Sequence, residues 1–408
     1  MERLTGQDII CLAHLPWDGP WKTYHQIISR VAESNRVLCI DPPSTLRQVQ
    51  GVVQGRASIP PVLRRMSERL FVYHPPWWLS RPRTPSVEGV IAPLRLRHAL
   101  WTSRRLGFRS PILWTFEPTL GPSTDLFAPR FLVYHVVDNY VEYLPSAATA
   151  ARVRMAGNHD RLLGRADVVL AVTPGLRDAC RRVNPSTYLV PNAVDVERFQ
   201  RAVADPYVPD DLRGIRKPIV GYVGGIEPKF DLETIRWLAE ARPQWSVVIV
   251  GPAMYASIRE ALRTLAARYP NVHYLNGKRP EEVPHYVKAL DVALLVDREK
   301  TDGDSLKLYE YLACGRPVVA FEASVYDSTR HMSHLLSLAK DREDFLVRVQ
   351  QGLDEPAGPA EARIAFAREQ TWQRRVEQMS GLIAARLPDG PSARRARHLD
   401  EAAGPQTR

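Results

Sequence analysis

The apolar positions of the first half of the chain fall in short continuous runs, and stretches with helical periodicity lie between several of them. The runs predict strands at residues 8–15, 36–41, 69–74, 111–116, 130–137, 167–173 and 187–194. Helices are expected at residues 21–33, 90–106 and 147–163. Because the runs are apolar at successive positions rather than at alternate ones, they are typical of a parallel sheet covered on both faces.

A second series of the same kind begins near Lys217. It predicts strands at residues 218–224, 246–251, 271–276, 291–296 and 316–321. Helices fit residues 232–241, 256–268, 280–289 and 305–314. Strands that alternate with helices indicate a doubly wound sheet. The expected fold class is therefore α/β, with two doubly wound (Rossmann-like) domains facing a cleft, and ligands bind in such sheets where the strands end.

The length of 408 residues also favours two domains over one. A polar, proline-containing segment at residues 202–211 is a plausible hinge. We expect an N-terminal domain at residues 1–200 and a second domain at residues 201–360. A helical stretch at residues 361–388 is expected to pack back toward the first domain, and a disordered tail to occupy residues 389–408.

Apolar runs and cysteines indicate a cytoplasmic protein. The longest apolar runs are far too short to cross a bilayer, and no basic-then-apolar segment predicts a secretion signal. The four cysteines lack the spacing of metal ligands, so they are expected to be small buried hydrophobic residues in a reducing compartment.

The positive charge of the chain is concentrated in one window. Residues 61–110 hold ten arginines and two glutamates, and Trp77 and Trp78 lie among them. Such a surface attracts anions. The pattern fits contact with an anionic membrane, which would make the protein peripheral on its inner face, and a plain solvated face equally well. A single-stranded nucleic acid fits it less well.

The sequence SLKLYEYLACGRPVVA (residues 305–320) predicts a helix that leads into a buried strand. Asp304 or Ser305 can cap the helix, and Gly315 ends it. A helical wheel places Lys307, Glu310, Tyr311 and Cys314 on the side away from the sheet. Lys307 in the first turn favours a phosphate, and a carboxylate one turn further suits a ribose diol. The alternative is a solvated Lys/Glu pair.

These residues, with GYVGGIEPKFDLETI (221–235) and VPNAVDVERF (190–199), resemble the GT-B glycosyltransferases, especially family 4. Asp302, where many members have glutamate, and Glu310 match the two acids of its Glu-x7-Glu region. The resemblance implies a nucleotide diphosphate sugar as donor in the second domain, a hydroxyl acceptor in the first, and no metal or other cofactor. Asp302 and Asp304 also spell the Asp-x-Asp metal motif of another glycosyltransferase fold, which we discount because that motif ends a strand early in the chain.

The resemblance implies further donor contacts. They are the backbone of Gly224 and Gly225 beside the phosphates, Lys229 near the leaving diphosphate, the Lys278 loop beside the nucleobase, and Ser305 and Leu306 at the helix start. The plain alternatives are a tight turn for the glycines and solvated loop positions for the lysines.

Five residues after or near the ends of strands in the first domain are candidates for the acceptor side or for catalysis. Asp18 and Gly19 follow the first strand, and Glu117 ends another. His135 and Asp138 lie at the end of the strand at residues 130–137, where either could accept the acceptor's proton. We name Asp138, Asp302 and His135 as catalytic candidates. The alternatives are a turn for Asp18-Gly19 and a core histidine for His135.

The sequence therefore predicts a glycosyltransferase that builds a surface polysaccharide, a glycolipid or a small-molecule glycoside. Family 4 members retain the anomeric configuration, so retention is expected, whereas direct attack assisted by Asp138 as a base would invert it. A nucleotide-sugar epimerase on the same fold, and a non-enzymatic membrane or nucleic-acid binding protein with a degenerate cleft, are the alternatives.

Overall fold

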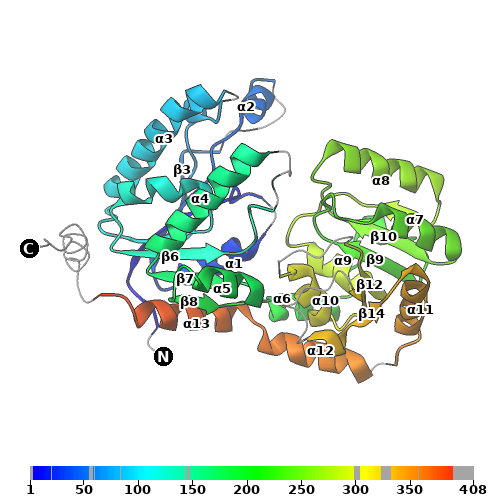
Figure 1. The fold of residues 1–408 in the computed structure, drawn as a ribbon. Coiled ribbons are helices and arrows are strands. Elements are labelled where there is room, and N and C mark those ends of the chain that lie inside the picture. Colours follow the sequence, from blue (N-terminus) through cyan, green and yellow to red (C-terminus); the bar gives the residue numbers. More distant parts are fainter. Residues whose placement is uncertain are drawn as a thin grey trace, which may run out of the picture. The chain divides into compact units, whose positions relative to one another are not determined.

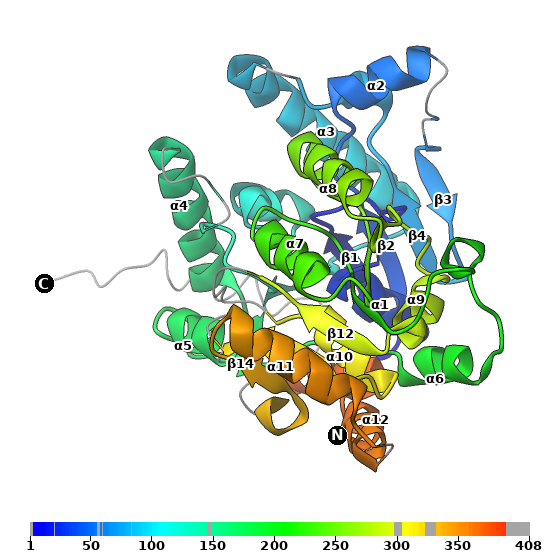
Figure 2. The same ribbon diagram turned by 90° about the vertical axis from the view of Figure 1, so that its right-hand side faces the viewer.

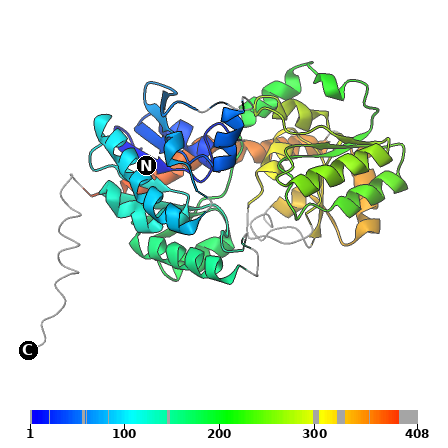
Figure 3. The ribbon, with the colours of Figure 1, turned by 90° about the horizontal axis from the view of Figure 1, so that it is seen from above.

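The computed structural model describes residues 3–19, 21–54, 58, 60–82, 84–142, 144, 148–297, 304–322, 332–356 and 358–388. The chain divides into two compact units. The first comprises Met1–Val190 and Val376–Arg408, and the second comprises Pro191–Arg375. Figure 3 draws the first unit mainly in blue to green and the second in green to orange.

The first unit is built on an eight-stranded sheet with the order β3-β4-β2-β1-β5-β6-β7-β8. Every pair is parallel except β3 with β4, which are antiparallel at the edge. The strands are β1 (Asp8–Leu12), β2 (Arg36–Ile40), β3 (Leu63–Arg65), β4 (Leu70–Tyr73), β5 (Ile112–Thr115), β6 (Phe131–Val136), β7 (Val168–Ala171) and β8 (Thr187–Leu189).

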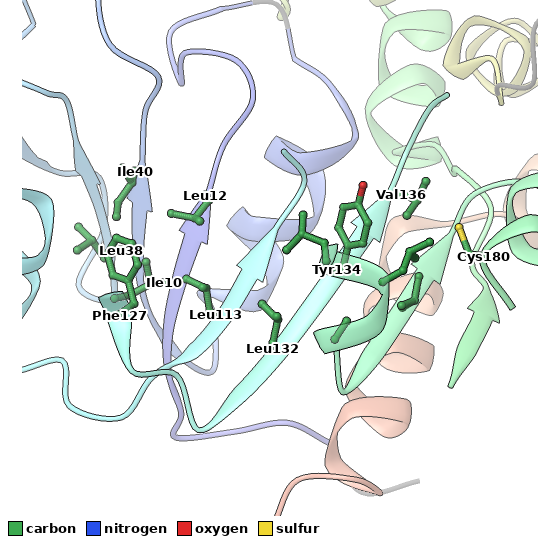
Figure 4. Packing of buried hydrophobic residues seen from close by; sticks show 14 of the residues in the cluster. Ile10, Leu12, Leu38, Ile40, Leu113, Phe127, Leu132, Tyr134, Val136 and Cys180 are labelled. Carbon is green, nitrogen blue, oxygen red and sulfur yellow. The ribbon is translucent and has the colours of Figure 1, made fainter. Parts of the chain in front are cut away.

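Helices lie on both faces of this sheet. They are α1 (Thr23–Val31), α2 (Leu46–Val53), α3 (Pro85–Arg105), α4 (Thr149–Arg165) and α5 (Pro174–Arg181), with the 3-10 helices η1 (Trp77–Leu79) and η2 (Pro118–Phe127). One face, which carries Ile10, Leu113 and Leu132, packs against α3, α4, α5 and η2 (Figure 4). Alternate residues face the other way. There Tyr24 of α1 lies beside Cys11 and Cys39.

The second unit contains a fully parallel six-stranded sheet with the order β11-β10-β9-β12-β13-β14. Its strands are β9 (Ile219–Val223), β10 (Ser246–Val250), β11 (Val272–Tyr274), β12 (Val292–Leu295), β13 (Val318–Phe321) and β14 (Ser337–Ala339). Its helices are α6 (Val196–Ala204), η3 (Asp210–Leu212), α7 (Leu232–Ala241), α8 (Ala256–Arg268), α9 (Val283–Ala289), α10 (Leu306–Ala313), α11 (Arg342–Leu353) and α12 (Gly358–Glu369).

The second sheet is buried on both faces, which explains its continuous apolar runs. Along β9, Val220 and Tyr222 belong to a core shared with α7, α8 and α11. Val223 belongs to a second core shared with α6, α9 and α10. Figure 2 shows α7, α8 and α11 on the side of this sheet nearest the viewer. The predicted fold class of two doubly wound domains is thereby confirmed.

The boundaries differ in detail from those expected. The second unit begins at Pro191 rather than after residue 200, because Val196 and Phe199 of α6 are buried in its core. The stretch at residues 361–388 forms two helices, α12 and α13 (Trp372–Ala384), rather than one. From Val376 onward α13 belongs to the first unit, where it runs beside β8 (Figure 1). There the Gln378 side chain donates to the Leu189 carbonyl at the end of β8 (3.2 Å).

Two short strands, β3 and β14, were not predicted, because their sequences, LRR and SLA, lack the continuous apolar run that marks the other strands. The four cysteines are buried and free, as expected. The predicted tail at residues 389–408 lies outside the described residues. Among the described residues, no helix combines the length and the apolar character that crossing a bilayer requires.

Candidate functional site

The ends of β9 and β10 form a surface of bare backbone in the second unit. Gly224 follows β9, and its amide donates to the Val250 carbonyl (2.9 Å). Gly251 follows β10 with φ of +146°, and a Cβ there would lie 1.8 Å from the Gly224 oxygen. At Gly225, by contrast, a Cβ would meet nothing within 4 Å. Glycine at 251 is thus required by packing, and Gly225 has open space beside it.

Lys307, in the first turn of α10, lies directly against this surface. A Cβ on Gly224 would be 2.4 Å from the Lys307 Cδ, so any other residue there would force the lysine stem to move. The Lys307 ammonium lies over the Tyr222 ring, 5.2 Å from its centroid. Two of the predicted donor contacts, Gly224 and Lys307, are therefore neighbours in the structure, where a cation and the start of a helix meet at the carboxyl end of β9.

Glu310 lies one turn further along α10 and shares a neighbour with Lys307. Burial raises the pKa of the Tyr311 hydroxyl, the Lys307 charge lowers it, and the Glu310 charge raises it further. Both charges therefore act on the same buried ring. Glu310 is half-buried in the middle of an otherwise apolar helix, and its carboxylate and the Lys307 ammonium are the charged side chains of α10.

The helical wheel was wrong about Tyr311 and Cys314, which are both buried. The Tyr311 hydroxyl accepts from the Val223 amide (2.8 Å) and donates to the Val223 carbonyl (3.1 Å). It thus ties α10 to the last residue of β9. The wheel assumed one covered side, but helices α6, α9 and α12 also pack around α10. The predicted helix end is confirmed, since Gly315 has φ of +69°.

Asp304 anchors the start of α10 in a way that the sequence did not reveal. Leu306 is the first residue of the helix and Ser305 is the N-cap residue. The Ser305 side chain makes no capping hydrogen bond. The Asp304 carboxylate turns instead to Asn192: its Oδ2 accepts from the Asn192 amide (2.7 Å) and from the Tyr309 hydroxyl (3.1 Å). The Asn192 side chain returns a bond to the Asp304 carbonyl (2.7 Å).

Asp304 as a whole is half-buried, but part of its carboxylate is closed off from water. The Asp304 Oδ1 is shielded from solvent and has no hydrogen-bond partner among the described residues. Burial raises the pKa of Asp304 to about 7, although the bonds from Asn192 and Tyr309 and the charge of Arg375 act to lower it. Arg375 in turn donates to the Pro191 carbonyl (3.0 Å). The start of α10 is thereby linked to the residues at which the chain enters and leaves the second unit.

Lys229 is engaged by carboxylates that sequence reasoning missed. Its ammonium lies 3.7 Å from Glu227 and 4.0 Å from Asp297. Asp297 follows β12, so the rule that polar residues after strands line a site could have found it. A diphosphate would therefore compete with these two carboxylates for the Lys229 ammonium.

Lys278, in the loop after β11, is also engaged. Its ammonium pairs with Asp211 and lies over the Tyr286 ring, 5.1 Å from the centroid. The backbone of its loop does approach the end of β10, since a Cβ on Gly277 would lie 3.4 Å from Pro252. Asp302, the first acid of the predicted pair, lies outside the described residues.

In the first unit, Asp18 and Gly19 form the expected turn after β1. The Gly19 amide donates to the Pro16 carbonyl (3.0 Å). The Asp18 carboxylate pairs with Arg64 (2.9 Å) at an exposed position. Asp18 is therefore accessible, but its charge is balanced by an arginine from β3.

His135, on β6, is fully buried and stacks on Phe116, with 4.9 Å between ring centroids. Burial and the neighbouring His14 lower the pKa of His135 to about 3. Burial also lowers the pKa of His14 to about 4. Sequence reasoning missed His14, although it follows β1 closely. Neutral imidazoles cannot provide positive charge near pH 7, so the environment of His135 agrees with a core histidine.

The two carboxylates near strand ends bind nearby backbone. Asp138, half-buried after β6, accepts from the amide of Asn139 (3.0 Å). Glu117 follows β5 and accepts from the Thr119 amide (3.0 Å), which caps η2. Glu117 thus caps a helix, and the role of Asp138 as a base stays a prediction.

Comparison with known families identifies the second unit. Residues 217–355 match the family described as glycosyl transferases group 1. A curated relative, the putative teichuronic acid biosynthesis glycosyltransferase TuaH of Bacillus subtilis (strain 168), is 34% identical over 140 residues, which cover 32% of this chain and 33% of the relative. The match thus spans about a third of the relative's length. Together with the family match, it confirms the resemblance of the second unit to glycosyltransferases that was noted in the sequence.

Solved structures extend the similarity to the whole fold. Sucrose-phosphate synthase from Thermosynechococcus elongatus superposes with a TM-score of 0.70 at 17% identity, covering 97% of this chain and all (100%) of that one. Anabaena HepE in complex with UDP and glucose gives a TM-score of 0.65 at 16% identity, covering 93% of this chain and 100% of that one. The fold is therefore GT-B, with two Rossmann-like domains.

Proposed function

We propose that this chain, which has the GT-B fold and carries a glycosyl transferase group 1 domain at residues 217–355, transfers a sugar from a nucleotide diphosphate sugar to a hydroxyl acceptor. The observation that carries the proposal is the packing of Lys307 against Gly224, with Glu310 one turn further along α10. The group thus combines bare backbone, a cation and a carboxylate inside the matched domain. HepE, which has the same fold, is solved with UDP and glucose.

Each element has a task in this proposal. The diphosphate lies at the start of α10, where amide groups and the helix dipole favour negative charge. Lys307 adds a full positive charge as the nucleotide diphosphate departs, which is when stabilisation of charge lowers the barrier most. Glu310 accepts hydrogen bonds from the two ribose hydroxyls. Gly225 gives the phosphates room to approach the backbone.

We propose that the reaction needs no metal ion, because Lys307 and the α10 amides supply the positive potential that a metal would provide. Transfer that continues unchanged in EDTA would support this. Activity that is lost in EDTA and restored by Mg²⁺ or Mn²⁺ would contradict it.

The acceptor is proposed to be a hydroxyl of a growing surface polysaccharide or glycolipid, since the curated relative is described as a teichuronic acid biosynthesis enzyme. A lipid-linked acceptor would place the enzyme in the cytoplasm at the inner face of the membrane. We infer that the anomeric configuration is retained. The coupling constant of the anomeric proton in the product, measured by NMR, tests retention, and an inverted linkage would contradict it and favour Asp138 as a direct base.

Thermal shift with UDP, GDP, TDP and ADP tests the donor site. A nucleotide at a hundred times its Kd raises the free energy of unfolding by about 2.7 kcal/mol. We expect one nucleotide to stabilise the wild type and to fail with Glu310→Ala and Lys307→Ala. Glu260→Ala and Lys340→Ala, at exposed positions of the same unit, are matched controls that should keep the shift.

The proposal fails if both site variants respond to nucleotide as the wild type does. Incubation of the wild type with the corresponding nucleotide sugar then separates the reactions. Release of the free nucleotide only when an acceptor is present indicates transfer. Conversion of the sugar without nucleotide release indicates an epimerase.

A further inference from the structure

Helix α3 of the first unit exposes a line of residues that a solvated helix would not be expected to carry. Positions 87, 90, 94, 97, 101 and 104 recur every three or four residues, so they share one side of the helix. All six are exposed, and Val90 and Trp101 reach 65% and 51%. The line consists of three aliphatic residues, one tryptophan and two arginines, and contains no acid.

The tryptophans of η1 extend this line into a surface. Trp78 is 57% exposed, and its ring centroid lies 5.9 Å from that of His98 on α3. His98 in turn lies 5.6 Å from Trp101. The neighbouring Trp77 is 56% exposed. Three half-exposed indoles therefore come from two elements that pack together.

Cations surround these indoles. The Arg105 guanidinium lies over the Trp101 ring, 4.4 Å from its centroid, and Arg97 and Arg104 are exposed on the same helix. The single acid of α3, Glu88, is already bound by both terminal nitrogens of Arg95 (3.0 and 3.1 Å). The surface formed by α3 and η1 is thus apolar and cationic, with its one acid neutralised.

We propose that this α3–η1 surface docks the protein on an anionic lipid bilayer. Indoles favour the level of the lipid headgroups, aliphatic side chains enter the acyl boundary, and each arginine near an anionic leaflet contributes about 1 kcal/mol. Docking on an anionic bilayer requires apolar and cationic side chains on the same surface, and the α3–η1 surface carries both. The inference rests on α3 and η1 alone, so it stands or falls independently of the transfer reaction.

Other occupants fit less well. Two copies related by a twofold axis would bring the same arginines face to face, which is repulsive. A single-stranded nucleic acid would use the indoles and arginines, but it would leave Val87, Val90 and Leu94 without a partner, because stacking needs aromatic side chains.

Flotation of the full chain with vesicles tests the proposal. The wild type should bind vesicles of phosphatidylcholine with phosphatidylglycerol and bind pure phosphatidylcholine much more weakly. The triple variant Trp77→Ser, Trp78→Ser, Trp101→Ser should lose binding to the mixed vesicles. A second variant, Val90→Ser with Leu94→Ser, should weaken it too, and circular dichroism checks that each variant is folded.

Arginine variants test whether vesicle binding depends on this surface or on the net charge of the whole chain. Replacing Arg97, Arg104 and Arg105 by serine should lower vesicle partitioning on the order of 100-fold, from about fivefold per arginine. The control replaces Arg181, Arg182 and Arg263, which are exposed on α5, at its end and on α8, and changes the net charge equally. It should change partitioning by only about twofold, since none of these three arginines belongs to α3 or η1 and salt screens charges that do not contact the lipid.

Four outcomes would overturn the proposal. The first is that the wild type fails to bind the anionic vesicles, and the second is that the tryptophan variant binds them as well as the wild type does. The third is that replacing the control arginines lowers partitioning as much as replacing those of α3. The fourth is that the wild type does not bind vesicles but forms a dimer in sedimentation, or an RNA complex in a gel shift, which the tryptophan variant does not form.

Discussion

Replacing Asp304 by asparagine should remove most of the pH dependence that this buried carboxyl gives to the second unit. Burial raises the pKa of Asp304 from 3.8 to about 7 in the folded chain. Between these values the folded state binds more protons than the unfolded state, so stability is lost as pH rises from about 4 to about 7. One pKa unit corresponds to about 1.36 kcal/mol, so the loss is at most about 4 kcal/mol.

Asparagine suits this position because of how the two oxygens are used. The Asp304 Oδ2 accepts both bonds, from Asn192 and Tyr309. The Oδ1 has no hydrogen-bond partner among the described residues. An asparagine can keep its carbonyl oxygen at the Oδ2 position and place its amide at the other. We therefore expect Asp304→Asn to match the wild type near pH 4 and to be more stable at pH 8, by up to about 4 kcal/mol.

Urea denaturation at pH 4, 5, 6, 7 and 8 measures this difference, and subtraction of the wild-type curve cancels the titration of the other groups. Asp304→Ala is the informative control: it leaves the Asn192 amide and the Tyr309 hydroxyl without this acceptor, at about 1–3 kcal/mol each. It should be less stable than Asp304→Asn at every pH. A difference between Asp304→Asn and wild type that does not change from pH 5 to pH 8 would refute the reasoning.

Three further predictions concern Gly251, Gly225 and His135. Gly251→Ala should destabilise the second unit by about 3 kcal/mol or more, since its Cβ would lie 1.8 Å from the Gly224 oxygen. Gly225→Ala, with nothing within 4 Å of a Cβ, should change stability by less than about 1 kcal/mol in the same denaturation assay. The His135 imidazole should not titrate between pH 5 and 8, because burial and His14 lower its pKa to about 3. Its folded form therefore loses stability only as pH falls below the ordinary value of 6.5, and an NMR midpoint above pH 6 would contradict this.

The sequence by itself determined the architecture and the centre of the candidate site. Continuous apolar runs are typical of strands buried on both faces, and the alternation with helices predicted two parallel sheets. Lys307 and Glu310 were predicted as a pair because a helix fixes the spacing of residues on its own surface. The glycines after β9 were predicted because glycine lets backbone approach a phosphate, and in the structure Gly224 packs against the Lys307 side chain.

Only the tertiary structure decided which partners these residues have. A helical wheel placed Tyr311 on the side away from the sheet, but a wheel takes no account of the other helices that pack around α10. Lys229 looked free in sequence, yet Asp297, from the end of another strand, lies 4.0 Å from it.

The clearest case is Asp304, whose carboxylate binds an amide 112 positions away along the chain. Periodicity reports contacts within one element, because a helix or strand repeats every few residues. Contacts between residues far apart in sequence depend instead on how strands are ordered and on which helix covers which face. The sequence thus placed the charges of the candidate site, and the topology of the second sheet decided which of them are buried, paired or open.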